Sequence, residues 1–346
     1  MTSIPDNAVL AAIRKLAFHE ALSSTDATAA FDQIMKGDAT STQVAGLLAG
    51  LRVKGESAAI VAGVAKALRN AMVHLEARNP EELVDTCGTG GGTVPTFNIS
   101  TAAALLAAGM GIRVAKHGNR SFTSKCGSAD VLEALDVRIE VDPERMARAL
   151  DEAGLVFMFA PLMHPAMKHV GPVRRELGIP TVMNIVGPLA NPASAQRQVI
   201  GVADLSRGPM LAEALLELGT IHSMVVHGEP GLDELSPMGV THVWEVRDGR
   251  LSEWTVQPGD FGFSIATADE LAGGSPEENA QIILEVLGGK GNAGAAAAVV
   301  LNAGAAVYVS GIDPDLKSAV HSAKKALEAG AGIVALQRLR SAYLAP

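Results

Sequence analysis

The spacing of apolar residues separates the chain into two unequal parts. Over residues 1–77 the apolar positions recur at intervals of three and four, a period that predicts amphipathic helices throughout. The helices expected there are Asp6–Leu22, Ala27–Met35, Ser41–Arg52 and Glu56–Leu75. Lysine–glycine pairs at Lys36-Gly37 and Lys54-Gly55 are typical of helix C-termini, which supports these divisions.

From Leu83 onward, short β-branched runs alternate with helical segments, which predicts a mostly parallel sheet flanked by helices. The expected strands are Leu83–Asp85, Arg113–Ala115, Val156–Phe159, Val199–Val202 and Ser223–Val226. An N-cap residue followed by proline predicts helix starts at Asp142-Pro143, Ser275-Pro276 and Asp313-Pro314. The fold class is therefore α/β, with a small N-terminal α-helical domain (residues 1–77) and a large α/β domain (residues 78–346) whose C-terminal part is helical.

Composition narrows the class of protein. The chain has 346 residues, of which 48% are hydrophobic and 19% are charged, and its net charge is −9. An acidic surface argues against a nucleic-acid binder that relies on a general basic face. The two cysteines, Cys87 and Cys126, are too few for a disulfide framework and are expected to be small buried or semi-buried thiols.

Neither a targeting segment nor a membrane span is expected. Residues 1–20 carry charges throughout and lack the apolar core of a signal peptide. The longest apolar run, Gly294–Val309, contains Asn302 and is shorter than the ~20 residues needed to cross a bilayer. We expect a soluble cytoplasmic protein that binds neither membranes nor nucleic acid.

The most informative stretch is Asp85–Thr101, which reads DTCGTGGGTVPTFNIST between an expected strand at Leu83–Thr86 and a helix that opens near Asn98–Ser100. Glycines allow positive φ and close backbone approach, and N–H groups at a helix N-terminus attract anions. Glycine loops of this kind also serve tight turns. This one lacks the GK[ST] of a Walker loop and does not fit the GxGxxG dinucleotide fingerprint.

A second polar cluster, KHGNRS at Lys116–Ser121, follows the apolar segment Gly111–Ala115. Anionic ligands of open α/β sheets bind at the carboxyl ends of strands. Two such clusters at two strand ends predict one site for a ligand with several phosphates. Farther along, four prolines interrupt the basic segment His164–Asn191, which is expected to line a cleft or to join the two domains.

These motifs and further ones occur in an order that resembles the anthranilate phosphoribosyltransferase family over nearly the whole chain. The matching stretches are the glycine loop with TFNIST, KHGNRS, GSAD (Gly127–Asp130), HPAMKHVGPVRRELG (His164–Gly178), NIVGPLANP (Asn184–Pro192) and GLDELS (Gly231–Ser236). The resemblance implies transfer of the phosphoribosyl group of 5-phosphoribosyl 1-pyrophosphate (PRPP) to the amine of anthranilate, the second step of tryptophan biosynthesis. It also implies a homodimer formed through the N-terminal α-domain. Hinge segments join the two domains, and the segment of about 164–191 contributes to the α-domain.

By the same resemblance, the donor site holds PRPP through glycine backbone, hydroxyl, amide and lysine groups. They are Gly88, Thr89, Gly90, Gly91, Gly92, Thr96, Asn98, Ser100, Thr101, Lys116, Asn119 and Ser128. Pyrophosphate departure needs a divalent cation, and adjacent hard oxygen ligands suit Mg²⁺. The expected ligands are Asp233, Glu234 and Ser100. An Asp-Glu pair alone is more often a solvated loop, and the matching residues around this pair reverse that reading.

The residues expected around anthranilate are Gly88, His117, Asn119, Ala160, His164, Arg174 and Gly187. Arg174 fits the carboxylate because a guanidinium fork binds it bidentately, whereas neighbouring Arg175 better fits a surface ion pair. Asn119 is expected to accept a hydrogen bond from the amine. Each histidine has a structural alternative as a hydrogen-bonded core residue. An aromatic amine is neutral at pH 7, so no catalytic base is assigned.

Two positions depart from the family pattern. The family loop usually reads GTGGD, and here Gly92 replaces the aspartate; Cys126 replaces a common serine. The missing carboxylate either alters metal and donor binding or only tunes the metal dependence.

Two rival functions stay open from the sequence. A pyrimidine nucleoside phosphorylase shares the fold and a KHGNRS-like element but usually carries a further C-terminal domain. A non-catalytic nucleic-acid binder of this fold should show a basic stripe and eroded metal and acceptor residues.

Overall fold

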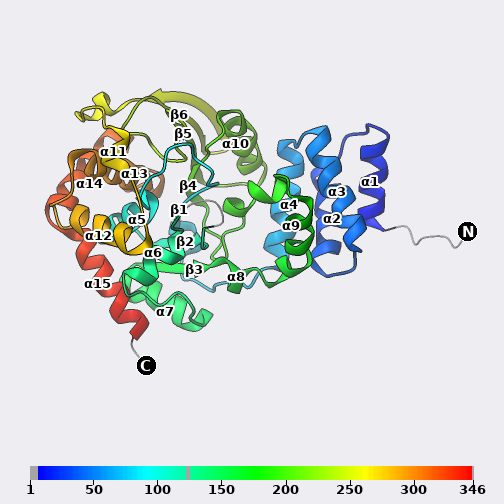
Figure 1. Ribbon diagram of the computed structural model, residues 1–346, viewed down its shortest axis with the longest axis horizontal. Helices are drawn as coiled ribbons and strands as arrows, with labels where there is room; N and C mark the ends of the chain where they lie inside the picture. Colours follow the sequence, from blue (N-terminus) through cyan, green and yellow to red (C-terminus); the bar gives the residue numbers. More distant parts are fainter. Residues whose placement is uncertain (1–6, 122–124, 345–346) are drawn as a thin grey trace, which may run out of the picture.

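The computed structural model describes residues 7–121 and 125–344. Within these residues, a small helical part lies at one end and a larger α/β part, built on a seven-stranded sheet, lies at the other (Figure 1). The helical part contains α1 (Ala8–Ala17), α2 (Ser24–Met35), α3 (Ser41–Lys54) and α4 (Ala58–Ala71). The predicted fold class is confirmed.

The helix boundaries follow local capping more closely than apolar spacing. The first helix is shorter than the predicted Asp6–Leu22, because Asn7 caps Leu10 N and the chain turns at His19, whose φ is +59°. The second begins three residues before the predicted Ala27, since Ser23 and Asp26 form a capping box. Such caps satisfy the backbone N–H groups that every helix start leaves unpaired.

The sheet has the order β3-β2-β1-β4-β5-β6-β7. Strands β1 to β5 are parallel, and β6 and β7 are each antiparallel to the preceding strand. The bounds are β1 Val84–Gly88, β2 Val114–Gly118, β3 Leu155–Phe159, β4 Arg197–Gly201, β5 His222–Gly228, β6 Thr241–Arg247 and β7 Arg250–Val256. The prediction of a mostly parallel sheet is therefore correct, although the β6–β7 hairpin was not predicted.

That hairpin carried a signal in the sequence. Arg247 pairs with Arg250 across the two-residue turn Asp248-Gly249, and both turn residues have positive φ, at +51° and +72°. An Asp-Gly pair between alternating apolar and polar residues is a strong sign of such a turn. The hairpin extends the sheet beyond β5, and the five parallel strands form the rest of the sheet out to its other edge at β3.

The helices cover the sheet in two layers, and the two largest apolar clusters of the described residues lie on its opposite faces. On one face, Val199 and Val226 contribute to the cluster that contains α5 (Ile99–Gly109) and α13 (Ala293–Ser310). On the other face, Ile200, Val225 and Trp244 join a cluster that runs through α10 (Gly208–Glu217) into α2, α3 and α4. The core of the helical part therefore continues onto one face of the sheet.

The remaining helices surround these layers (Figure 1). They are α6 Ser128–Ala134, α7 Pro143–Ala153, α8 Ala160–Met163, α9 Gly171–Leu177, α11 Ala268–Leu271, α12 Pro276–Leu287, α14 Leu316–Glu328 and α15 Ala331–Leu344. The short 3₁₀ turns are η1 Pro80–Glu82, η2 Pro165–His169, η3 Val182–Asn184, η4 Gly187–Leu189, η5 Leu205–Arg207 and η6 Pro258–Phe261. Although α9 follows β3 in the chain, it packs beside α3 in the helical part.

Two of the three predicted helix starts are confirmed and one is wrong. Asp142 caps α7, and Ser275 with Glu278 forms the predicted capping box of α12. The predicted start at Asp313-Pro314 is displaced, because Asp315 accepts from Ser318 N and is the true N-cap of α14. Asp315, two residues later, is the N-cap because its side chain reaches a backbone N–H of the first turn.

Helix α13 is long and apolar enough, by length and composition, to cross a membrane. Its 18-residue apolar window is, however, 83% buried inside the protein, which identifies it as a core helix. Within it, Asn302 donates to Leu235 O (3.0 Å) and accepts from Leu235 N (2.9 Å). The amide-bearing residue of the predicted apolar run thus ties the helix to the loop that carries Glu234.

Candidate active site

The sheet changes its winding direction between β1 and β4, which are neighbours although two strands separate them in the chain. A crevice at such a switch point is where open α/β sheets bind ligands. The glycine loop leaves β1 at this point, and Thr89 N donates to Gly201 O at the end of β4 (2.9 Å). Gly90 and Gly91 have φ of +70° and +82°, so the predicted need for glycine there is confirmed.

The loop that follows β5 closes over the glycine loop. Gly90 N donates to Asp233 Oδ2 (2.9 Å), and Thr93 Oγ1 donates to Pro230 O (3.0 Å). A Cβ atom on Gly88 would overlap the Asp233 carboxylate, and one on Gly201 would overlap its backbone. Two segments far apart in the sequence therefore meet only because both strand ends lack side chains.

Lys116 joins the second strand end to this cluster. Its Nζ donates to Thr86 O and to Ser100 Oγ (3.2 Å), and the residue is 3% exposed. Burial lowers the pKa of Lys116, and the nearby carboxylates, Asp85 first among them, oppose that fall. The structure thus brings together the lysine of KHGNRS, the N-terminus of α5 and the glycine loop, as expected from the sequence.

The Asp233–Glu234 pair lies at the same place, where two adjacent acidic side chains disfavour each other's negative charge. Burial raises the pKa of Asp233. Burial and then the Asp233 carboxylate raise the pKa of Glu234 to about 8, while Lys116 and the Ser100 backbone N–H oppose the rise. A divalent cation would favour the ionised form of both carboxyl groups, so the donor set fits Mg²⁺, which takes one or two carboxylates and completes its shell with water and phosphate.

Within the described ranges, no group of three or more His, Cys, Asp and Glu side chains is arranged to hold a metal ion. If they bind a cation, the oxygens of Asp233, Glu234 and Ser100 could therefore supply only part of its coordination shell. Such a partial shell is typical of magnesium sites that bind the cation together with a phosphate substrate.

A buried carboxylate that was not predicted as a site residue lies behind Lys116. Asp85 is fully buried, and its carboxylate accepts from Asn191 Nδ2 (2.8 Å) and from His117 N (3.2 Å). Asn191 also donates to Ala115 O (2.8 Å), which joins the end of the NIVGPLANP segment to β2. Burial raises the pKa of Asp85, and the Asn191 hydrogen bond is the main opposing influence.

The other predicted donor residues line the two strand ends. Ser128 Oγ donates to Asn119 O (3.3 Å), and Asn119 Oδ1 accepts from Arg120 N (2.8 Å), which leaves that oxygen partly engaged. Thr101 is buried in the first turn of α5, and its Oγ1 has no hydrogen-bond partner among the described residues. Thr96, Asn98 and Gly92 belong to the stretch between the glycine loop and α5, and Gly92 is exposed.

Two predicted acceptor residues form a buried pair. The rings of His117 and His164 lie 4.9 Å apart, and the Nε2 atom of each is buried without a partner among the described residues. Burial lowers the pKa of His117 to about 3, with His164 and Lys116 contributing, and lowers the pKa of His164 to about 4. Both imidazoles are therefore neutral at pH 7, with a free polar atom each.

The remaining acceptor residues lie on the segment that crosses to the helical part. Arg174 on α9 donates to Asn184 Oδ1 (3.4 Å), and partial burial lowers its pKa. Ala160 opens α8, and a Cβ atom on Gly187 would meet open space. Within the described part of the chain, hydrogen bonds join Gly90 to Asp233 and Lys116 to Ser100 across different segments, whereas that of Arg174 stays within its own segment.

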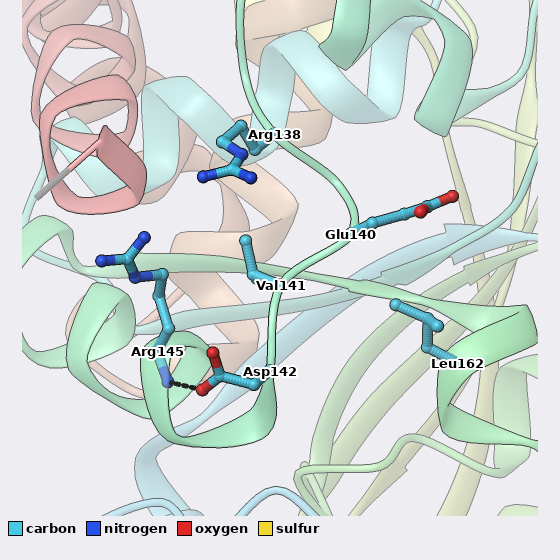
Figure 2. A pocket seen from close by; sticks show the side chains of 6 residues that line it. All are labelled: Arg138, Glu140, Val141, Asp142, Arg145 and Leu162. Atoms are coloured by element: carbon cyan, nitrogen blue, oxygen red, sulfur yellow. Dashed lines mark hydrogen bonds between the residues drawn. The ribbon is translucent and has the colours of Figure 1, made fainter. Parts of the chain in front are cut away.

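Two hollows lie outside this cluster. One, of about 390 Å³, is lined by two arginines, Arg138 and Arg145, and two acidic residues, Glu140 and Asp142 (Figure 2). The other, of about 570 Å³, lies beside residues 272–282 at the start of α12. None of the predicted site residues lines either hollow, so these two hollows do not belong to the candidate site.

Two family models match the chain. Residues 80–333 match the α/β domain of a glycosyl transferase family, and residues 10–72 match the helical bundle domain of such a family. The fold and the site therefore define a glycosyltransferase of this two-part class.

Curated relatives narrow the class. Anthranilate phosphoribosyltransferase from Rubrobacter xylanophilus is 48% identical over 327 residues, 94% of this chain and 95% of its own length. The enzyme of the same name from Methylobacillus flagellatus is 46% identical over 330 residues, with 95% and 96% covered. The chain belongs to the anthranilate phosphoribosyltransferase family.

Solved structures of the family agree with the fold. Anthranilate phosphoribosyltransferase from Thermus thermophilus superposes with a TM-score of 0.91 at 42% identity, covering 96% of this chain and 99% of that one. The Saccharomyces cerevisiae enzyme in complex with PRPP and Mg superposes with a TM-score of 0.87 at 30% identity, with 97% of each chain covered.

Proposed function

We propose that this chain transfers the phosphoribosyl group of PRPP to the amine of anthranilate and releases pyrophosphate, the second step of tryptophan biosynthesis from chorismate. One observation carries the proposal: Lys116, the glycine loop and the Asp233–Glu234 pair meet at the switch point of the sheet. Backbone N–H groups, a buried cation and a carboxylate pair suit a pyrophosphate that arrives with its metal. Family membership supplies the identity of both substrates.

The donor residues act by positioning and by neutralising charge. Thr89, Gly90 and Gly91 would hold the pyrophosphate with loop N–H groups, since their backbone is already fixed by Gly201 and Asp233. Burial lowers the pKa of Lys116. The negative charge of a bound phosphate would oppose that fall and favour the charged ammonium. The anomeric carbon develops positive charge as pyrophosphate leaves, and these preset groups stabilise the departing anion.

Asp233, Glu234 and Ser100 would hold Mg²⁺, and the related yeast enzyme forms a complex with PRPP and Mg. When bound, the cation neutralises charge on the leaving pyrophosphate. The raised pKa of Glu234 supports this assignment, because burial and then the Asp233 carboxylate disfavour its charged form, which a cation would stabilise.

The acceptor is held by neutral groups and one guanidinium. His117 and His164 offer two buried imidazole nitrogens, and Asn119 keeps one lone pair for the amine. Arg174 would pair with the anthranilate carboxylate, with room for the ring at Ala160 and Gly187. Because the amine is already neutral, the reaction needs orientation more than a base.

The assembly forms part of the same proposal. We place the domain boundary near Asn79-Pro80, with segment 164–191 contributing to the helical domain, as the packing of α9 on α3 supports. The helical domain would form the homodimer, and the protein would act in the cytoplasm.

The loss of anthranilate fluorescence on mixing the protein with PRPP, Mg²⁺ and anthranilate tests the function. Turnover that a chelator abolishes and Mg²⁺ restores is the expected result. Folded protein that leaves anthranilate unchanged at every Mg²⁺ concentration would overturn the proposal.

A further inference from the structure

We propose that Asn279, on α12, is a positioning residue for the donor site, because it fixes the orientation of the Asn98 side chain at the N-terminus of α5. Asn279 belongs to no motif that identifies the family in this sequence, and 181 positions separate it from Asn98. The inference rests on the proposed function, since it assigns Asn98 to the PRPP site.

The backbone N–H of Gly274 determines which end of the Asn279 side-chain amide is the oxygen. Asn279 is 2% exposed, and its Oδ1 accepts from Gly274 N (2.7 Å). A backbone N–H can only donate, so this end of the side chain has to be the oxygen. The NH₂ group of Asn279 therefore faces Asn98 and donates to Asn98 Oδ1 (2.9 Å).

The backbone carbonyl of Cys126 determines which end of the Asn98 side-chain amide is the NH₂ group. Asn98 Nδ2 donates to Cys126 O (3.3 Å), which can only accept. The Cys126 thiol donates to Asn98 Oδ1 (3.2 Å), so the oxygen receives two hydrogen bonds. Among the described residues the second N–H of Asn98 has no partner and would be available to a ligand. Reversing the amide would place oxygen against Cys126 O and NH₂ against Asn279.

Asn98 stands where orientation matters. It is the N-cap residue of α5, but its side chain makes no hydrogen bond to its own helix. Two residues later, Ser100 accepts from Lys116 Nζ (3.2 Å) and presents its backbone N–H to Glu234. Asn279 and Cys126 thus fix the Asn98 amide on the first turn of α5, the turn whose Ser100 contacts Lys116 and Glu234.

Residues 271–279, which we call the α12 support, hold the end of the glycine loop at two further points. Phe97 N donates to Leu271 O (2.9 Å). A Cβ atom on Gly273 would lie 2.5 Å from Thr96 O, so the two backbones are in close contact there. Within this support, the Asn279 side chain sets the orientation of Asn98. An apolar side chain in its place would remove a hydrogen bond from Asn98 Oδ1 and one from Gly274 N.

Three variants separate positioning from stability. Asn279→Ala removes both hydrogen bonds, and Asn279→Asp keeps the acceptor for Gly274 N while presenting oxygen to Asn98. Ile283→Val is the matched control, since Ile283 is fully buried on the same helix within the apolar core. Steady-state kinetics give KM for each substrate, and the rise in Tm caused by PRPP with Mg²⁺ reports donor binding without turnover.

We expect Asn279→Ala to raise KM for PRPP about fivefold to tenfold, the effect of one misdirected hydrogen bond, and to change KM for anthranilate by less than about twofold. Asn279→Asp should raise KM for PRPP at least as much, although its side chain has nearly the same size. Ile283→Val should lower Tm and leave both KM values unchanged.

Equal changes in the two KM values, or a PRPP-dependent rise in Tm that is the same in all three variants, would overturn the role of Asn279. A wild-type protein that binds PRPP but never consumes anthranilate would instead refute the proposed function, and the Tm readout would still decide the role of Asn279. A wild-type protein that does not bind PRPP would refute both.

Discussion

Gly92→Asp restores the carboxylate that the glycine loop of the family usually carries. Unlike Gly90 and Gly91, Gly92 does not have positive φ, so an ordinary side chain fits its backbone. Its Cβ atom would lie 3.2 Å from Gly231 O and 3.5 Å from Asp233 Oδ1. The first contact requires a shift of a few tenths of an ångström, and the second places the new carboxylate beside the proposed metal ligand.

Two carboxylates about 5 Å apart repel by about 3 kcal/mol at an effective dielectric constant of about 20. Gly92 is exposed, so solvent reduces this to roughly 1 kcal/mol. Without metal, the variant should therefore be slightly less stable than the wild type. With Mg²⁺ the repulsion becomes attraction, and we expect the half-saturating Mg²⁺ concentration to fall about tenfold, a difference of about 1.4 kcal/mol.

Initial rates measured against free Mg²⁺ test this, with Gly92→Asn as a control of the same size and no charge. The maximal rate of Gly92→Asp should stay within about twofold of the wild type, because the change affects metal binding and not the reacting groups. Superimposable Mg²⁺ titrations for the Asp and Asn variants would refute the electrostatic reasoning. A large fall in maximal rate with unchanged Mg²⁺ dependence would refute it as well.

Three further predictions concern other parts of the molecule. Arg174→Ala should raise KM for anthranilate at least about tenfold, whereas Arg175→Ala should leave it unchanged. Since burial lowers the pKa values of His117 and His164 to about 3 and about 4, the unfolded chain binds more protons below about pH 6.5, so stability should fall from there towards about pH 4. Urea titrations of a His117→Phe/His164→Phe variant, repeated from pH 7 towards about pH 4, should show an unfolding free energy that depends less on pH. Tyr343→Phe removes a buried hydroxyl that is hydrogen-bonded to β3 and should lower the unfolding free energy, measured by urea titration, by about 1 kcal/mol without changing either KM.

The parts of the fold that depend on near neighbours could be predicted from the sequence. Helix starts at Asp142 and Ser275, and the glycine loop between β1 and α5, follow from local chemistry. The misplaced start at Asp313 shows the limit of this reasoning, because Asp315 offered a competing cap two residues away. Where two such signals lie two residues apart, the sequence does not show which side chain will reach the first turn of the helix.

The site was predictable as a set of residue types but not as a set of contacts. Motif matches selected Lys116 and Asp233, yet nothing in the sequence indicated that Gly90 N binds the Asp233 carboxylate across 143 positions. Asp85 was passed over because an aspartate at the end of an apolar strand gives no sign of its partner Asn191. Such contacts depend on the order of strands in the sheet, which the alternation of helices and strands does not specify.

The continuous core beneath α10 has a consequence for experiments on parts of the protein. Helix α10 lies between α4 and the β5–β6 face of the sheet, and its apolar side chains touch both. A fragment cut near residue 78 would therefore leave a large apolar surface without cover, and neither piece should be stable alone. Heating the whole chain should give a single calorimetric transition. Movement of the helical part would also displace β4 and β5, whose carboxyl ends lead to Gly201 and the loop of Asp233.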